Sequence, residues 1–491
     1  MDREIIIDGI KNYHFIKQLK NVAEHTPDKI AVRGMGEAFT YRQLDLITEA
    51  IGEALVKKGL TPNKIVAVIH ERHVNVILAA IGCWKARVGY FYLDTKMPDY
   101  QKQQRLADSD CEYIIKREFI EELKEKVLRE NYVAEELPVG DMDDIAWILY
   151  TSGSSGVAKG VILRHCNISV HMNIANTFRT TENSVQSMMA SFSFMSGLLE
   201  GFPILYQGGT LTMVPNEYRR NWRQIVDFLR EEKVTIAFVP SHYAEQIVKE
   251  NLEIPSLKVL FTGGEPVHNL KAETYDIYCV YGSSECGGPV TCCKIQDSRE
   301  EYPIGEAIPM ARVYLLKENS MELVEKAGEI GEICISGRQI CDGYLKRDDL
   351  NVQKFSRNPF TDDPNYAVIY RTGDLGRLDE NGDIYYAARA DLMCKIKSFR
   401  IEIGTVEAEL LKYPGIERCV VKPLIAPDGE KELHGFYYAD KELDKTELKT
   451  YLRDKLNHYM VPVDFHRLEQ IYIMDNGKVD RSKVHLEGYR E

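Results

Sequence analysis

The chain has 491 residues, of which 44% are hydrophobic and 28% charged, the ordinary balance of a globular protein. This length predicts about three domains or subdomains. The formal net charge of −13 argues against a nucleic-acid binder, because phosphate backbones require a basic face. The N-terminal sequence lacks the pattern of a signal peptide, and no apolar run reaches the ~18 residues of a membrane span. The eleven cysteines include no CxxC pair typical of zinc sites, so we expect a reduced, cytoplasmic enzyme.

The first part of the chain alternates expected helices with expected strands. Apolar residues spaced by three or four predict an amphipathic helix in the segment 41–60, which closes with two lysines and Gly59. A buried strand (64–70), a helix (74–84) and another strand (90–93) follow. Strands that alternate with helices predict the α/β class, with mostly parallel sheets flanked by helices.

A second series of strands follows an expected helix over 222–232. The strands fall within 235–241, 257–265 and 275–285, and each runs into small or polar residues at its carboxyl end. Ligands collect at that edge of open α/β sheets. We therefore expect one cleft lined by Ser241-His242, Gly263-Gly264-Glu265 and Gly282-Ser283-Ser284-Glu285.

The last hundred residues have a different pattern, with strands expected at 416–426 and 434–440 and a helix over 445–460. A segment of about one hundred residues is long enough to form a small α+β domain with its own core. We predict a large N-terminal domain of residues 1–390 and a small mobile C-terminal lid domain of residues 391–491.

The stretch LYTSGSSGVAKGV (149–161) is rich in glycine and serine and contains one lysine. It is not a P-loop, because GxxxxGK[ST] would require glycine at Ala158 and serine or threonine at Gly160. Such a loop can still wrap polyphosphate with its backbone N–H groups. A plain surface turn is the alternative interpretation.

This stretch resembles the phosphate loop of the adenylate-forming enzymes, the superfamily of acyl-CoA synthetases, luciferases and nonribosomal peptide synthetase adenylation domains. The usual proline before the lysine is Ala158 here. Further motifs similar to those of the superfamily follow in the expected order. They are YGSSE (281–285), GEICISGRQICDGY (331–344), YRTGDL (370–375), RADLMCKIKSFRIEIGTVE (389–407), HYMVPVDF (458–465) and NGKVDR (476–481).

The resemblance implies an AMP-forming carboxylate ligase, an acid–thiol ligase that uses ATP and Mg²⁺. The carboxylate reacts with ATP to give acyl-AMP and pyrophosphate, and the acyl group then passes to a thiol. A mixed anhydride divides one difficult substitution into two easier ones. Cationic groups and a metal ion are expected around the α-phosphorus, where negative charge develops.

The motifs imply a role for each residue that they match. The phosphate loop would contribute Thr151, Ser152, Gly153, Ser154, Ser155, Gly156 and Lys159. The remaining nucleotide contacts would come from Gly263, Gly264, Glu265, Tyr281 (adenine), Gly282, Ser284 (α-phosphate) and Asp374 (ribose). Glu285 would hold Mg²⁺, because hard cations take oxygen ligands.

Lys478 is the expected catalytic residue, together with Glu285 and Arg389; in the family this lysine bridges the substrate carboxylate and the α-phosphate. Asp391 resembles the hinge residue of the small domain. Arg389 and Arg400 would contact the nucleotide or the thiol donor. Ser398 replaces the family's usual glycine where the pantetheine arm passes, a difference that concerns thiol transfer.

The acid pocket is expected to be mostly apolar. Met195 stands where amino-acid-activating relatives have the aspartate that pairs with the α-ammonium, and methionine cannot form this pair. The sequence therefore favours a hydroxylated aryl acid or a 2-oxo or 2-hydroxy acid, while an unusually held amino acid and an aliphatic acid stay open. The implied pocket consists of Met195, Ser196, Leu199, His242, Phe261, Gly263, Val280, Gly288 and Pro289.

The expected acceptor is a phosphopantetheinylated carrier protein in trans, since the chain contains no LGGxS-like serine site. Free coenzyme A is the alternative. A nucleotide-binding module without turnover is a further alternative, which the presence of Lys159, Glu285, Asp374 and Lys478 disfavours. No nucleic-acid or membrane partner is expected.

Overall fold

The structure, a computed structural model, describes residues 4–129, 132–151, 158–264, 266–389, 393–397, 399–470 and 481–490. The chain divides into two compact units. The larger comprises Met1–Lys96, Gln103–Thr151 and Gly160–Ala388, and the smaller comprises Met97–Lys102, Ser152–Lys159 and Arg389–Glu491. The domain boundary at residue 390 stays a prediction, because residues 390–392 are not among those described.

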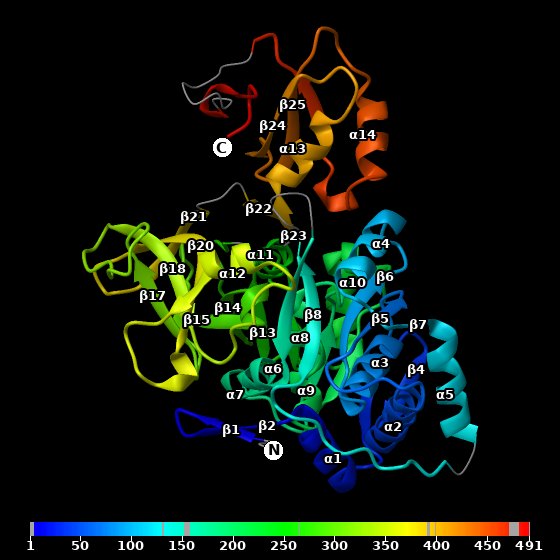
Figure 1. Ribbon diagram of the computed structural model, residues 1–491. Helices are drawn as coiled ribbons and strands as arrows, with labels where there is room; N and C mark the ends of the chain where they lie inside the picture. Colours follow the sequence, from blue (N-terminus) through cyan, green and yellow to red (C-terminus); the bar gives the residue numbers. More distant parts are fainter. Residues whose placement is uncertain are drawn as a thin grey trace. The chain divides into compact units, whose positions relative to one another are not determined.

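The larger unit contains a five-stranded sheet flanked by helices. Its order is β7 (Tyr113–Ile115), β5 (Ile65–His70), β6 (Gly89–Asp94), β8 (Ile145–Thr151) and β9 (Lys159–Arg164). The first four strands pair in parallel. Helix α2 (Tyr41–Lys57) packs on α3 (Val74–Lys85), which contacts β5 and β6 (Figure 1). The helices and strands predicted between residues 41 and 93 are thus confirmed.

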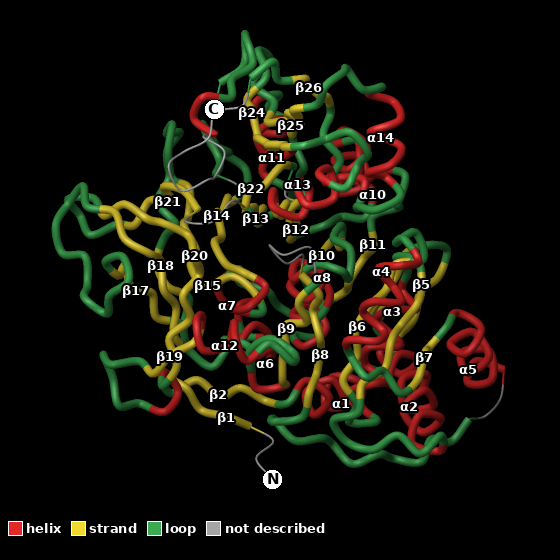
Figure 2. The backbone as a smooth tube through the Cα atoms, turned by 45° about the horizontal axis from the view of Figure 1, so that its top comes forward, coloured by secondary structure: helices red, strands yellow, loops and turns green. Residues whose placement is uncertain are grey.

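The larger unit also contains a nine-stranded sheet. Its order is β16 (Glu306–Ala307), β15 (Gly288–Ile295), β14 (Asp276–Ser283), β13 (Val259–Gly263), β12 (Ile236–Phe238), β10 (Val185–Met188), β11 (Thr210–Met213), β3 (Ile30–Gly34) and β4 (Glu37–Thr40). Strands β14, β13, β12, β10 and β11 follow one another from left to right in Figure 2.

Pairing in this sheet is parallel from β14 to β3 and antiparallel at β14–β15, β15–β16 and β3–β4. The three strands that the sequence predicts after residue 235 are therefore adjacent and parallel. Their carboxyl ends lie at one edge of the sheet, where the sequence predicts ligand contacts.

A third sheet is antiparallel in its described pairings. Its order is β17 (Arg312–Leu316), β18 (Ile330–Ser336), β20 (Val368–Leu378) and β19 (Phe355–Arg357), with β21 (Ile384–Arg389) beside β20. Strands β1 (Glu4–Ile7) and β2 (Ile10–Tyr13) form a separate hairpin. The remaining α-helices of the larger unit are α1 (Phe15–His25), α5 (Arg117–Arg129), α6 (His165–Met172), α7 (Ile174–Thr177), α8 (Met195–Gly201), α9 (Pro203–Tyr206), α10 (Trp222–Glu231), α11 (Ser241–Lys249) and α12 (Asp348–Lys354). Helix α4 (Asp99–Asp108) is divided between the two units after Lys102.

One apolar core connects the five-stranded and the nine-stranded sheets of the larger unit. It includes Trp147 of the five-stranded sheet, Leu211 of the nine-stranded sheet, and helices between them. The rings of Trp84 and Phe202 lie 4.7 Å apart within it. Burial of large apolar side chains drives this association, so both sheets are parts of one folding unit.

The smaller unit has the predicted α+β pattern. It contains β24 (Arg418–Ile425), β25 (Lys431–Tyr438), β26 (Asp464–Arg467), the hairpin β22 (Met393–Ile396)–β23 (Phe399–Glu402), and helices α13 (Ile403–Leu411) and α14 (Lys445–Arg453). The prediction of one helix over 445–460 is wrong in its second half. Asn457 has an extended backbone and starts a separate 3-10 turn, His458–Met460.

Arg72 connects the five-stranded sheet to the nine-stranded one. It follows β5, and its buried guanidinium donates to the carbonyl oxygens of Ala190 (2.9 Å), Val214 (2.8 Å) and Met188. These carbonyls follow or end the central strands β10 and β11. Arg72 therefore fixes the backbone from which the chain proceeds to Met195.

Glu200 holds the same stretch of backbone through its N–H groups. This fully buried residue of α8 accepts hydrogen bonds from the backbone N–H groups of Met189 and Ala190. Burial raises the pKa of Glu200, whereas the two amides and the charges of Arg72 and Arg219 oppose the rise. We call Arg72 and Glu200 the loop clamp, because together they fix the start of the loop that precedes α8.

The substitution Glu200→Ala removes the acceptor of the backbone N–H groups of Met189 and Ala190. Backbone donors left without an acceptor in the interior cost about 3 kcal/mol in total. We expect the free energy of unfolding, measured with urea, to fall by about that amount. The control is Glu250→Ala, which breaks an exposed 3.1 Å ion pair with Arg223 and should cost less than about 1 kcal/mol. Equal losses in the two variants would contradict a role of the loop clamp in stability.

Candidate active site

Tyr281 and Asp374, the expected adenine and ribose contacts, are joined by a hydrogen bond. The Tyr281 hydroxyl donates to Oδ2 of Asp374 at 2.7 Å, and both residues are buried. Burial, followed by the charge of Asp374, raises the pKa of Tyr281 well above its usual value, so the hydroxyl stays a donor. This bond connects β14 to β20 and fixes the position of the expected ribose ligand.

Asp374 is also oriented through its own backbone. Its N–H donates to the Thr372 hydroxyl at 2.9 Å, and that hydroxyl donates to the carbonyl of Ile333 at 2.6 Å. Strands β18 and β20 thus determine where this carboxylate lies.

Glu285, the expected metal ligand, lies in the 3-10 turn Ser284–Cys286, directly after β14. Its Oε1 accepts a hydrogen bond from the Tyr344 hydroxyl at 2.8 Å, and its backbone carbonyl accepts one from the Cys341 N–H at 2.7 Å. Only 2% of the residue is exposed. Two contacts from the segment around residue 341 therefore orient a buried carboxylate.

The same segment pairs with the strand that follows the expected phosphate loop. Val161 of β9 forms an antiparallel bridge with Tyr344, and the Leu345 N–H donates to the Gly160 carbonyl at 2.8 Å. Tyr344 thus connects Glu285 with β9. In the sequence, Tyr344 is the last residue of the motif 331–344, and nothing in that motif predicts a role for Tyr344 in the site.

Several described residues of the expected nucleotide site lie at or near strand ends, whereas Asp374 lies within β20. Thr151 ends β8 and Lys159 begins β9; Gly263 ends β13, and Tyr281 and Gly282 lie near the end of β14. The expected contacts Ser152, Gly153, Ser154, Ser155, Gly156 and Glu265 lie outside the described residues.

The roles expected near the C-terminus are not tested by the structure. Lys478, Asp391 and Ser398 lie outside the described residues. Arg389 ends β21 and Arg400 lies in β23, but their side chains are not described either. Their catalytic, hinge and nucleotide-binding roles stay predictions.

Three expected pocket residues pack together. Leu199 of α8, Phe261 of β13 and Val280 of β14 belong to one buried apolar cluster. The ring of Phe178, which is not among the pocket residues that the motifs imply, lies 4.8 Å from that of Phe261, and the two planes differ by 13°. We call the stacked rings of Phe178 and Phe261 the aromatic wall.

The other expected pocket positions lie on neighbouring elements. Met195 and Ser196 are half-buried at the start of α8, where Met195 packs against the core between the parallel sheets. His242 is half-buried in α11, and Gly288 and Pro289 are buried at the start of β15, which α8 contacts. The structure therefore places most of the pocket around α8, β13, β14 and β15.

Gly263 is a position where only glycine fits. It pairs with Val280 in the parallel ladder, and a Cβ at Gly263 would overlap the Val280 carbonyl oxygen. The absence of a side chain lets β13 and β14 approach closely at the expected site.

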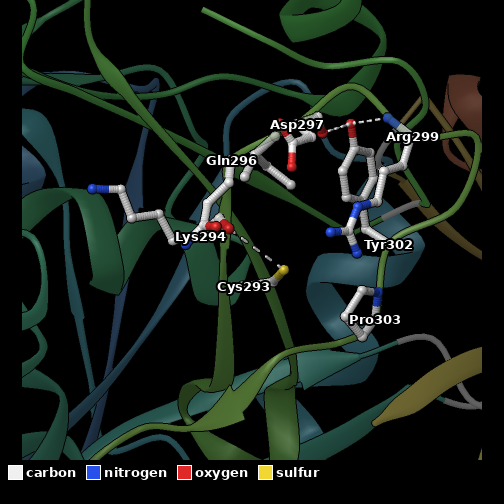
Figure 3. A pocket seen from close by; sticks show the side chains of 8 residues that line it. Cys293, Lys294, Gln296, Asp297, Arg299, Tyr302 and Pro303 are labelled. Carbon is white, nitrogen blue, oxygen red and sulfur yellow. Dashed lines mark hydrogen bonds between the residues drawn. The ribbon is translucent and has the colours of Figure 1, made fainter. Parts of the chain in front are cut away.

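A small cavity lies at the opposite end of β15 from Gly288, and Figure 3 shows Tyr302 among the side chains that line it. Its volume is about 70 Å³, well below the roughly 300 Å³ from which ligand pockets start. None of the expected site residues lines it; the lining residues are Cys293, Lys294, Ile295, Gln296, Asp297, Arg299, Tyr302 and Pro303. This cavity is therefore not the candidate site.

Glu285 is the residue that would hold Mg²⁺. Across the described ranges, no group of three or more histidine, cysteine, aspartate or glutamate residues could hold a metal ion. Mg²⁺ typically binds through one or two carboxylates and takes its other ligands from substrate phosphates and water. A single oriented carboxylate fits that mode of binding.

None of the described helices combines the length and apolar character needed to cross a membrane.

Comparison with known proteins gives the family. Residues 19–345 match the family described as AMP-binding enzyme. The chain is 31% identical to part of bacitracin synthase 1 from Bacillus licheniformis, covering 96% of this chain and 9% of that protein. It is 30% identical to part of tyrocidine synthase 3 from Brevibacillus parabrevis, covering 94% of this chain and 7% of that protein. The chain thus spans under a tenth of the length of these curated relatives.

Solved structures share the fold. An artificially fused adenylation–PCP di-domain from Klebsiella oxytoca, NpsA-ThdA, has a TM-score of 0.81 and 22% identity, over 93% of this chain and 94% of that one. A variant of o-succinylbenzoate CoA synthetase from Bacillus subtilis has a TM-score of 0.81 and 19% identity, over 96% and 99% of the two chains. The family match shows that the chain belongs to the AMP-binding enzymes, and its similarity to segments of peptide synthases supports an AMP-forming ligase.

Proposed function

We propose that this enzyme activates an acid other than an ordinary α-amino acid, with an aryl acid or a 2-oxo or 2-hydroxy acid as the favoured class. The observation that carries this proposal is the expected pocket, whose positions contain no carboxylate and have methionine at 195. An α-ammonium there would be buried without a counter-charge.

The aromatic wall favours the aryl acid within that class. Phe178 and Phe261 present nearly parallel rings in the same cluster as Leu199 and Val280. Aromatic faces and edges contribute more than buried area alone when a planar ring packs against them. A planar acid would therefore gain more from this cluster than an aliphatic one.

The nucleotide would be held by the residues that β14 and β20 orient. Asp374, fixed by Tyr281, would accept hydrogen bonds from the ribose hydroxyls. Glu285, fixed by Tyr344, would ligate Mg²⁺. When bound there, Mg²⁺ neutralises phosphate charge.

We propose that the acyl group then passes to the phosphopantetheine thiol of a carrier protein in trans. The similarity to segments of peptide synthases and to an adenylation–PCP di-domain supports this acceptor. Free coenzyme A is the runner-up acceptor, which the similarity to a CoA synthetase supports. The small unit would act as a mobile lid that carries Lys478.

ATP–pyrophosphate exchange over a panel of acids tests the substrate class. The panel contains proteinogenic amino acids, hydroxybenzoates and aminobenzoates, and 2-oxo and 2-hydroxy acids. We expect exchange with an aryl acid or an oxo or hydroxy acid and none with amino acids. Acyl transfer to a carrier protein is then compared with transfer to coenzyme A, and faster transfer to coenzyme A would contradict the proposed acceptor. Exchange with an ordinary amino acid would refute the assignment of Met195.

Substitution of Asp374 by alanine should weaken ATP binding. The change removes two charge-assisted hydrogen bonds to ribose, so we expect the KM for ATP to rise by roughly ten- to a hundredfold. Tyr281→Phe removes only the hydroxyl that orients the carboxylate and should raise KM by a few-fold. An unchanged KM for ATP in Asp374→Ala would exclude the ribose role.

Substitution of Lys478 by alanine should abolish adenylation. Loss of a cation at the developing negative charge typically lowers kcat by about 10²–10³-fold, and we expect ATP–pyrophosphate exchange to fall at least that far. ATP affinity, measured by calorimetry, should stay within a few-fold. The exposed Lys441→Ala serves as the matched control in the same unit. Normal exchange in Lys478→Ala would overturn the catalytic assignment.

A further inference from the structure

His171, near the carboxyl end of α6, is a fully buried histidine that the expected site does not include. Its Nε2 lies 2.7 Å from the carbonyl oxygen of Cys286. A carbonyl oxygen only accepts hydrogen bonds, so Nε2 carries the proton and Nδ1 presents a lone pair. Burial lowers the pKa of His171 to about 4, and the ring is therefore neutral at pH 7.

The acceptor atom Nδ1 has no hydrogen-bond partner within the described part of the chain. Folded proteins satisfy nearly all such buried atoms with protein groups, water or ligands. A buried acceptor left without a donor is unfavourable, because it has lost its hydrogen bonds to water. A ligand that donates to Nδ1 would remove this cost.

The position of the ring is defined by its contact with β15. A Cβ on Gly288 would lie 2.5 Å from both Nδ1 and Cε1 of His171. The imidazole thus fills the space that a side chain at position 288 would occupy. Gly288 is an expected pocket residue, so a residue of α6 provides there the side chain that Gly288 lacks.

The surroundings of this contact also belong to the pocket. The side chain of Cys286, whose carbonyl binds His171, packs in the same cluster as Phe261 and Val280. The donor edge of the imidazole thus meets Cys286, and its acceptor edge lies on the side of Gly288, an expected pocket residue.

We infer that His171 is a specificity-determining residue that selects an aryl acid whose ring carries a hydroxyl or amino group, which donates a hydrogen bond to Nδ1. This inference rests on the proposed function. An unsubstituted ring leaves Nδ1 without a donor, and a methoxy group directs a lone pair against it. A saturated 2-oxo acid offers no donor at all.

The test with unaltered enzyme measures kcat/KM for ATP–pyrophosphate exchange with three matched series of benzoates. The 2-, 3- and 4-hydroxybenzoates and the aminobenzoates are compared with benzoate and with the methoxybenzoates. We expect at least one hydroxy or amino acid to exceed both benzoate and its methoxy counterpart by roughly ten- to a hundredfold.

Two variants then assign the preference to His171. His171→Phe keeps a planar ring without the acceptor and should reduce the preference to within about threefold. His171→Asn keeps an amide oxygen near the position of Nδ1 and should retain part of it. The control His165→Phe removes another buried imidazole of α6 and should leave the ratio of the two kcat/KM values unchanged. Because each result is a ratio within one protein, lower stability of a variant does not alter its meaning.

The outcomes separate the inference from the function on which it rests. Exchange with aryl acids that does not depend on a ring donor, or an equal preference in His171→Phe and the unaltered enzyme, overturns the role of His171 alone. Exchange only with oxo, hydroxy or aliphatic acids overturns the proposed aryl class and the inference together. A donor preference that His171→Phe removes and His171→Asn partly retains supports both.

Discussion

The parallel pairing of β13 with β14 is the constraint on which the candidate site depends. Gly263 allows the two strands to approach, because any side chain there would overlap the Val280 carbonyl. The pairing brings Phe261 and Val280 into one apolar cluster and sets the course of β14 toward Tyr281 and Glu285. The residues that we propose to bind the acid and the nucleotide therefore share one stretch of backbone.

Two buried tyrosines orient the carboxylates that we propose as ligands of ribose and Mg²⁺. Tyr281 and Tyr344 each donate a hydroxyl hydrogen bond to a carboxylate, on Asp374 and Glu285 respectively. A hydroxyl group orients a carboxylate without adding a second charge, whereas a lysine or arginine would form an ion pair and compete with a metal ion or a cationic ligand. Each tyrosine comes from a different segment from its partner, so folding assembles both pairs.

The sequence could predict features that depend on neighbouring residues. The helix near residue 41 follows from its apolar spacing, and the small residues that end β13 and β14 follow from the strand pattern. Motif order predicts Tyr281, Glu285 and Asp374 as site residues, and these roles stay predictions. The prediction of a helix was wrong in the second half of 445–460. There the backbone of Asn457 is extended, and the spacing of apolar residues does not predict this conformation.

Contacts between residues far apart in the chain could not be predicted from the sequence. Tyr344, Phe178 and His171 resemble ordinary core residues in the sequence, since nothing nearby indicates which strand each will meet. Arg72 gave one signal, a charged residue just after a buried strand, but its targets on β10 and β11 depend on how the two sheets pack. Sheet order and packing decide these partners, and neither follows from periodicity.

The loop clamp also bears on how such an enzyme can change its substrate. Arg72 and Glu200 bind backbone carbonyl and N–H groups, and these groups are the same whatever side chains the loop carries. These interactions hold residues 188–190, directly before the segment 191–196, so exchanges of side chains within that segment leave them in place. A scaffold of this kind tolerates drift in acid preference during evolution. It also offers protein engineers a short segment for randomisation whose anchoring residues lie outside the randomised positions.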